Sequence, residues 1–329
     1  MNQLLLILLK ASRKLYTVVF GLKTIQKPEC DQNPDTVSQT IFEALISDKP
    51  CMIARFGSTE LTCMCNYLGI KYHKYKFLEF IKGNTFLWWW DSKIINQMQQ
   101  WSGFFPANED KIEQFCELMI HNIKELDILG SWLANETYFK QHLAHTKKIR
   151  LMYLDPYWSM IPWTKALKGK NILVVHPFAE SIKKQYRKRE FLFENQDILP
   201  EFKSLTVIKA VQSLGQPDSR FNDWFEALEY MKEEINKIDF DICLIGCGAY
   251  GFPLAAHVKR IGKKAVHIGG SLQLLFGIRG KRWENDNPHY TDPGNVYIYY
   301  NGLPNEYWVR PSENEKPTNH EKVENSCYW

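Results

Sequence analysis

The feature that most constrains the fold is the run of residues 239–270, DFDICLIGCGAYGFPLAAHVKRIGKKAVHIGG. Its apolar segment 241–245 is long enough for a buried strand and too short for a helix, and 265–268 is a second such segment. Between them, a glycine-rich turn leads into apolar residues at helical spacing. The pattern predicts a strand–turn–helix–strand unit whose helix N-terminus receives a phosphate. The residues expected to cradle that phosphate are Gly246, Gly248 and Gly251.

The glycine turn matches the letters of a dinucleotide-binding fingerprint, but its surroundings do not. An NAD site needs an acidic residue about 20 residues further on, at the end of the second strand. Here that strand ends in His267-Ile268-Gly269. The missing acid argues against a nicotinamide cofactor and weakens the case for a methyltransferase, which also holds a ribose there. A glycine turn that only packs a helix on a strand remains the structural alternative.

The composition is that of an ordinary soluble globular protein, since 45% of the 329 residues are apolar and 24% are charged. A net charge of +4 is too small to indicate nucleic-acid binding, and no DNA- or RNA-binding motif occurs in the sequence. The eight cysteines form no Cys-x-x-Cys pair, which argues against structural zinc. With no export signal, the sequence predicts a protein of the reducing cytoplasm.

Residues 1–25 form a separate segment, in which the apolar run Leu4–Leu9 is followed by Lys10, Arg13 and Lys14. The run is too short to span a bilayer. Two interpretations carry equal weight. One is an amphipathic helix that lies on an anionic membrane surface, and the other is a helix docked on the protein's own core.

A polar cluster, RFGSTE, directly follows another predicted strand, Cys51–Ala54. In open α/β sheets, ligand groups lie at the carboxyl ends of the strands. Arg55 could hold a phosphate through a bidentate contact, and Glu60 could bind a metal or a sugar hydroxyl. The alternative is simple helix capping, with Ser58 or Thr59 at the cap and Glu60 in the first turn.

Further strands are predicted at 171–175 and 206–210, in a region that alternates strands with helices. This alternation predicts an α/β fold with a Rossmann-like, doubly wound and mainly parallel sheet. His176 and Glu180 follow the first of these strands, so they are expected at the ligand edge. A histidine in such a place is nevertheless more often structural than catalytic.

Residues 72–150 are expected to be a helical insertion rich in aromatic residues. Its tryptophans could stack on sugars, although most residues of this kind belong to a core. The main domain is expected to span 36–310, and the polar tail 311–329 is expected to be disordered.

A basic loop punctuated by glycines, GIRGKRW, covers residues 277–283. Its glycines allow the backbone to approach a ligand closely, and Arg279 and Arg282 could neutralise a diphosphate. Residues 297–300 are expected to form a last edge strand.

The polar cluster and the late glycine turn together resemble the GT-D-type glycosyltransferases. Residues 55–60, RFGSTE, are similar to that family's Arg-aromatic-Gly-Asp-Gly-Glu signature, and 244–248 and 267–269 resemble its glycine turn and its Asp-Ile-Gly strand end. The resemblance implies a Rossmann-like sheet and the transfer of a sugar from a nucleotide-diphosphate donor. The resemblance implies a role in bacterial surface-glycan or glycoprotein assembly, and the expected acceptor is a glycan or lipid-linked molecule of surface-polysaccharide synthesis, such as that of a capsule. The expected location is the cytoplasm, at the inner face of the cytoplasmic membrane if residues 1–25 form a membrane-surface helix.

Carried over residue by residue, the resemblance places Glu60 at the second acid of the family's Asp-x-Glu metal motif. Ser58 replaces the first acid, and a hydroxyl is a poorer ligand for Mg²⁺ or Mn²⁺ than a carboxylate. His267 stands where the family often has an acid. The expected catalytic residues are Glu60, His176 and Glu180. The expected nucleotide-sugar-binding residues are Arg55, Gly57, Ser58, Gly246, Gly248, Gly251, His267, Gly269, Arg279 and Arg282.

Two other classes of function remain open from the sequence. One is a different nucleotide-dependent transferase, such as an S-adenosylmethionine-dependent methyltransferase, which would use the same glycine turn. The other is a non-catalytic scaffold associated with a membrane, which the weakened metal motif and the N-terminal segment would suit.

Overall fold

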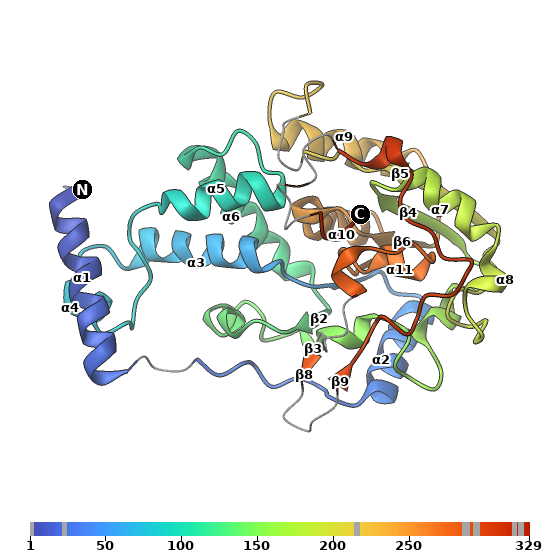
Figure 1. Ribbon diagram of the computed structural model, residues 1–329, viewed down its shortest axis with the longest axis horizontal. Coiled ribbons are helices and arrows are strands. Elements are labelled where there is room, and N and C mark those ends of the chain that lie inside the picture. The colour runs from blue at the N-terminus through green and yellow to red at the C-terminus, as the bar shows by residue number, and fades with distance from the viewer. Residues whose placement is uncertain are drawn as a thin grey trace.

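Seven parallel strands form the centre of the molecule, in the order β3-β2-β1-β7-β6-β4-β5 (Figure 1). In this computed structural model the described residues are 3–21, 25–213, 218–284, 290–291, 297–317, 321 and 326–329. The strands are β1 (Cys51–Ala54), β2 (Ile128–Ser131), β3 (Lys147–Arg150), β4 (Asn171–His176), β5 (Ser204–Lys209), β6 (Ile242–Ile245) and β7 (Lys264–His267). Because every pairing is parallel, the carboxyl ends of all the strands meet at one edge.

Helices cover both faces of this sheet, so the fold is a doubly wound α/β fold, as the sequence predicted. On β1, Met52 and Ala54 pack towards one face, and Cys51 and Ile53 pack towards the other. The first face is covered by α3 (Ser58–Tyr72), α5 (Ser92–Ser102), α6 (Glu109–Asn122), α9 (Trp224–Asn236) and α10 (Gly251–Arg260). The second face is covered by α2 (Pro34–Ile46), α7 (Ala179–Tyr186), α8 (Arg189–Leu192) and α11 (Leu272–Leu275).

Polar side chains begin several of these helices. The side-chain oxygen of the residue before the helix accepts a backbone N–H of the first turn, which satisfies one of the donors that a helix start leaves open. The residues that do this are Asn33 for α2, Asp91 for α5, Asn108 for α6 and Asp223 for α9. No such cap from the preceding residue begins the other helices whose start the structure describes: α3, α4 (Phe77–Ile81), α7, α8, α10 and α11.

Five of the six strands predicted from the sequence belong to this sheet, as β1, β4, β5, β6 and β7, with bounds within two residues of the expected ones. The stretch 72–150 was expected to be a helical insertion, and this is wrong in part. It contains helices, but it also supplies β2 and β3, which extend the sheet beyond β1. Both strands have only four residues, and β3 is the charged edge sequence KKIR, so neither has the long apolar run that signals a strand.

The expected last strand forms, but not in the main sheet. Strand β9 (Tyr297–Ile298) pairs antiparallel with β8 (Tyr290–Thr291) in a separate two-stranded ribbon.

The tail 311–329 was expected to be disordered, but its described residues pack against the domain. Glu315 is buried and accepts hydrogen bonds from the backbone N–H groups of Glu180 (2.8 Å) and Ser181 (3.2 Å) and from the Ser181 hydroxyl. It therefore caps α7 from more than a hundred residues away, a contact that the tail's polar composition cannot reveal. Residues 318–320 and 322–325 lie outside the described residues.

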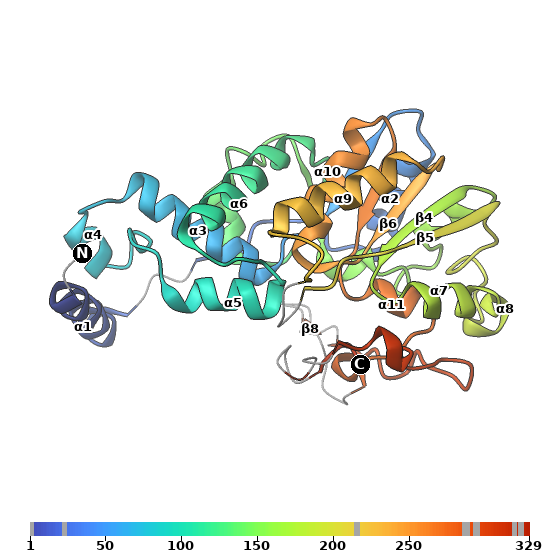
Figure 2. The same ribbon diagram turned by 90° about the horizontal axis from the view of Figure 1, so that it is seen from above.

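Helix α1 (Gln3–Phe20) lies at one end of the molecule, beside α4 (Phe77–Ile81) and far from α2, α7 and α8 (Figure 2). Its Leu9 is buried in a small cluster with Phe80 and Trp88. Residues 1–2 and 22–24 of the predicted segment 1–25 lie outside the described residues. Within the part of the chain that the structure describes, no helix has the length and apolar character needed to cross a membrane.

Replacing Glu315 by alanine should lower the free energy of unfolding by about 2 kcal/mol, because three donors at the start of α7 lose a charged acceptor. Denaturant unfolding followed by circular dichroism measures the change. Glu313 is exposed two residues earlier, so Glu313→Ala is the matched control, with an expected change within about 0.5 kcal/mol. Equal effects of the two substitutions would contradict the cap.

Candidate functional site

A pocket of about 490 Å³ opens at the carboxyl edge of the sheet. It is lined by the turns that follow β1, β4, β6 and β7 and by the C-terminal end of α5. Most of the site residues predicted from the sequence line it together: Arg55, Gly57, Ser58, Glu60, His176, Gly246, Gly248, His267, Gly269 and Arg282. The structure thus brings two motifs that are almost two hundred residues apart in the sequence into one cavity.

Three predicted residues do not line the pocket. Glu180 has a side chain that is 54% exposed, and its carboxylate pairs with Lys183 at 3.0 Å. The Nε atom of Arg279 lies 3.8 Å from a carboxylate oxygen of Glu284. Gly251 lies behind the pocket wall, under the ring of His267.

Arg55 is the most unusual group in the pocket. Its Nε atom is buried and has no hydrogen-bond partner, and its guanidinium is in no ion pair with a carboxylate of the described residues. A Cβ on Gly269 would lie 3.6 Å from the same Nε, so the ends of β1 and β7 meet at this side chain. The side chain is half-buried in the pocket wall, so a bound anion can pair with the guanidinium and supply the missing hydrogen-bond acceptor.

Trp132 holds Arg55 in place. The guanidinium carbon of Arg55 lies 5.3 Å from the centre of the Trp132 ring, a cation–π distance. The indole N–H donates to the backbone oxygen of Phe56 at 3.0 Å. The buried carboxylate of Glu136 accepts the backbone N–H of Trp132 at 3.0 Å and the hydroxyl of Ser131. This support comes from the turn after β2, which the sequence analysis did not assign to the sheet.

At two of the glycine positions, a neighbouring side chain occupies the space that a Cβ would need. A Cβ on Gly57 would lie 1.7 Å from Oε2 of Glu60, so only glycine lets that carboxylate fold back over the start of α3. A Cβ on Gly251 would lie 2.1 Å from Cε1 of His267. Gly248 is different, because its φ of +58° is one that other residues rarely adopt.

The two pocket histidines are neutral. Burial lowers the pKa of His176 to about 3, and its Nδ1 accepts the backbone N–H of Phe178 at 3.0 Å. Its proton is therefore on Nε2. Burial and the nearby Arg55 charge lower the pKa of His267 to about 3, and its Nδ1 lies 3.2 Å from the backbone oxygen of Ile245. That carbonyl can only accept, so the proton of His267 is on Nδ1.

Asp155 is a pocket carboxylate that sequence reasoning missed. It follows the short 3₁₀ helix Leu151–Leu154 after β3, and it accepts hydrogen bonds from the hydroxyls of Ser271 (2.7 Å) and Tyr300 (2.5 Å). Burial raises its pKa to about 6, although these hydrogen bonds and the charge of Arg55 act to lower it. The only available signal was an acid directly after a buried apolar run, LMYLD, in a segment that was not recognised as the end of a strand.

The C-terminal residues form another wall that the sequence did not indicate. Tyr328 and Trp329 line the pocket, and the Tyr328 ring lies against Gly270, where a Cβ would be 2.3 Å from Cε1 of the tyrosine. The guanidinium of Arg282 lies 4.8 Å from the centre of the Tyr328 ring and donates to its hydroxyl at 3.1 Å. The tail thus keeps Arg282 at the pocket.

The family model described as the GT-D fold-like domain matches residues 32–275, which is most of the chain. The chain belongs to the GT-D-like family. Comparison with curated proteins and with solved structures finds no match for it. The match covers β1 to α11 and both sequence motifs that resemble this family, so the family assignment made from those motifs is confirmed.

The GT-D-like domain does not present a donor set suited to a divalent metal. Within the described residues, no three His, Cys, Asp or Glu side chains gather into a group that could hold an ion. Ser58 is exposed in the position of the family's first acid, and Glu60 alone remains of the motif. Arg55 lines the same pocket, and its positive charge would repel a metal ion. No step of the chemistry below passes through one.

Asp155 makes the stability of this GT-D-like domain depend on pH. Its pKa is about 6 in the folded protein, compared with 3.8 ordinarily, so the folded state binds the proton more tightly than the unfolded state. The free energy of unfolding that the protonated Asp155 contributes is fully present below about pH 4 and is lost as the pH rises through about 6. Between about pH 4 and pH 7, the native protein should lose about 3 kcal/mol of unfolding free energy relative to Asp155→Asn. Denaturant titrations at a series of pH values measure this difference, and a difference that is flat or rises with pH would contradict it.

Proposed function

We propose that this protein transfers a sugar from a nucleotide-diphosphate donor to a hydroxyl of a glycan or lipid-linked acceptor. The family supports a glycosyltransferase-like fold. The observation that carries the proposal is the half-buried Arg55 at the meeting point of β1 and β7, whose Nε has no hydrogen-bond partner. A diphosphate is an anion of the size and charge that such a site favours.

The donor diphosphate would lie between Arg55 and the start of α10. The turn residues Cys247, Gly248 and Ala249 line the pocket just before that helix. Because α3 has no side-chain cap, its first N–H groups are available to an anion, which the helix dipole also favours. Arg282 supplies a second cation at the pocket wall.

The walls offer places for the sugar and the base. Trp101 lines the pocket at the end of α5 and is 40% exposed, which is unusual for a tryptophan beside a cavity. A ring face of this kind stacks on a nucleobase or on the apolar face of a sugar. His176, with its proton on Nε2, serves as a hydrogen-bond donor. It does not serve as a base at neutral pH because its pKa is far too low.

In the reaction, the acceptor oxygen forms a bond to the anomeric carbon while the bond from that carbon to the diphosphate breaks. The leaving diphosphate takes the electron pair, and Arg55 and Arg282 stabilise the charge that develops on its oxygens. The proton of the acceptor hydroxyl passes to a carboxylate. Glu60, held over Gly57 at the pocket, is proposed for that role or for orienting the donor sugar.

The biological setting rests on the family resemblance alone. We place the reaction in bacterial surface-polysaccharide assembly, in the cytoplasm at the inner face of the cytoplasmic membrane. The acceptor would then be a growing glycan or a lipid-linked precursor, and it would reach the pocket from the side opposite the donor diphosphate.

Arg55→Met should abolish nucleotide binding and leave the fold intact, because it removes the cation expected to hold the diphosphate and keeps most of the side-chain volume. A thermal-shift series with UDP, GDP, ADP and CDP tests this. A diphosphate present at about 100 times its Kd stabilises the native protein by about 2.7 kcal/mol, which is a clear rise in Tm. Arg279→Met is the matched control, since Arg279 lies outside the pocket, and it should keep the full shift. Stabilisation by S-adenosylmethionine, with none by any diphosphate, would refute the proposal.

Glu60→Gln should lower sugar transfer or donor hydrolysis by roughly 10²- to 10⁴-fold, the usual range for loss of a proton-transferring group. Binding of the nucleoside diphosphate should be unchanged, because the substitution leaves Arg55 in place. Donor turnover is measured by the release of nucleoside diphosphate. The exposed Glu180 provides the control Glu180→Gln, which should behave like the native protein. Near-native turnover in Glu60→Gln would remove this residue from the mechanism.

A further inference from the structure

Helix α1 docks on the protein by its cationic side. The guanidinium of Arg13 lies 4.8 Å from the centre of the Phe80 ring. The ammonium of Lys10 lies 3.7 Å from a carboxylate oxygen of Asp91. Together with the buried Leu9, these contacts fix which side of the helix faces the domain.

The apolar stripe of α1 therefore faces away from the protein. Its residues recur at spacings of three, four and seven, and each is more than half exposed: Ile7, Leu8, Leu15, Val18 and Val19. Val18 reaches 77%. This is the reverse of an ordinary surface helix, which turns its apolar side to the core. Such a patch normally marks a surface that binds another phase or partner.

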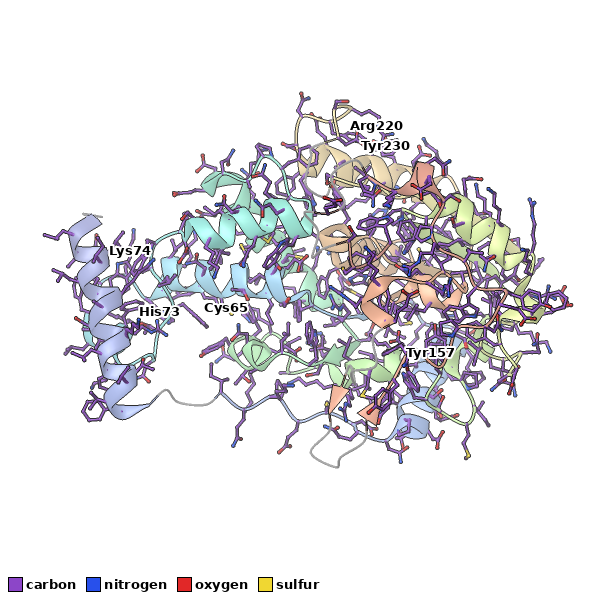
Figure 3. The ribbon with its side chains drawn as sticks, viewed as in Figure 1. Cys65, His73, Lys74, Tyr157, Arg220 and Tyr230 are labelled. Carbon is purple, nitrogen blue, oxygen red and sulfur yellow. The ribbon has the colours of Figure 1, made fainter. Side chains whose placement is uncertain are left out.

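The chemistry of the helix fits an anionic lipid surface. At about 100° per residue, the exposed stripe covers roughly 120° of the helix, broader than a coiled-coil seam. Of the three cations of α1, Lys10 and Arg13 contact the domain and Lys14 is exposed, and the helix has no acidic residue. Lys74 and Lys76 are exposed on the segment just before α4, and Figure 3 shows Lys74 at the α1 end of the molecule.

A second copy of the chain fits this surface less well. A symmetric dimer would set the same face of α1 against itself, so that Lys14 and its neighbours would meet like charges. The phosphate groups of a bilayer instead attract lysine and arginine, and its acyl chains accept the apolar stripe.

We propose that α1 is an interfacial anchor. It lies in the surface of an anionic bilayer with the stripe of Ile7, Leu8, Leu15, Val18 and Val19 in the acyl region. The opposite side of α1 holds the rest of the protein at the bilayer through its contacts with Phe80 and Asp91. This inference concerns attachment and not chemistry, so it stands or falls independently of the proposed sugar transfer.

Co-sedimentation of the full chain with vesicles tests the anchor. One set of vesicles contains phosphatidylglycerol and phosphatidylcholine, and the other contains phosphatidylcholine alone. The native protein should pellet with the anionic vesicles and much less with the neutral ones. Leu8→Glu combined with Leu15→Glu should weaken this partitioning at least ~10-fold, because two apolar side chains become charged ones. The variant should keep the native Tm, since both positions face outward.

The matched control is Ile46→Glu, which places the same charge on an exposed apolar residue of α2 at the opposite end of the molecule. It should bind vesicles like the native protein. If the glutamate variant fails to fold, Val18→Ser combined with Val19→Ser replaces it, with the same expected loss. Native protein that stays in the supernatant with anionic vesicles would overturn the anchor, as would unchanged binding by the folded variant. A lipid-independent dimer that Leu8→Glu with Leu15→Glu dissociates would assign the stripe to a second copy instead.

Discussion

The pocket depends on the half-buried positive charge of Arg55, which forms no ion pair with a carboxylate of the described residues. Arg55 sits where β1 and β7 end, with Nε out of reach of any acceptor and Trp132 against its face. Other features of the pocket act in the same direction. Neutral histidines add no competing charge, and α3, which begins at this pocket, lacks the side-chain cap that begins α2, α5, α6 and α9. Both features allow the positive potential of Arg55 to attract an incoming anion into the pocket.

The glycines of the fingerprint have two different roles, which the sequence alone presents as one. Gly248 has a backbone angle that suits glycine and lines the pocket. Gly251 is small because the ring of His267 occupies the space where a side chain would be. The same histidine replaces the acid that an NAD site would need. The histidine at 267 and the glycine at 251 are therefore linked, because the imidazole of His267 fits only over a residue without a Cβ.

The parts of the structure that could be predicted are those encoded locally. Apolar runs followed by polar turns located five strands, and parallel pairing then brought Arg55, His176 and Gly248 to one edge. Asp155 could not be predicted because its partners, Ser271 and Tyr300, are 116 and 145 residues away. The orientation of α1 was open for a similar reason: a helical pattern shows an apolar side but not which side docks. Here Phe80 and Asp91 decide it.

The tail has a consequence for how the domain should be delimited. Composition suggests a boundary near residue 310, and a protein shortened there would lose the Glu315 acceptor at α7 and the tyrosine ring over Gly270. Arg282 would lose its stacking surface and hydroxyl contact at the same time. A failure of such a truncated protein to bind nucleotides would therefore report a dismantled wall of the cavity rather than the absence of a ligand-binding fold.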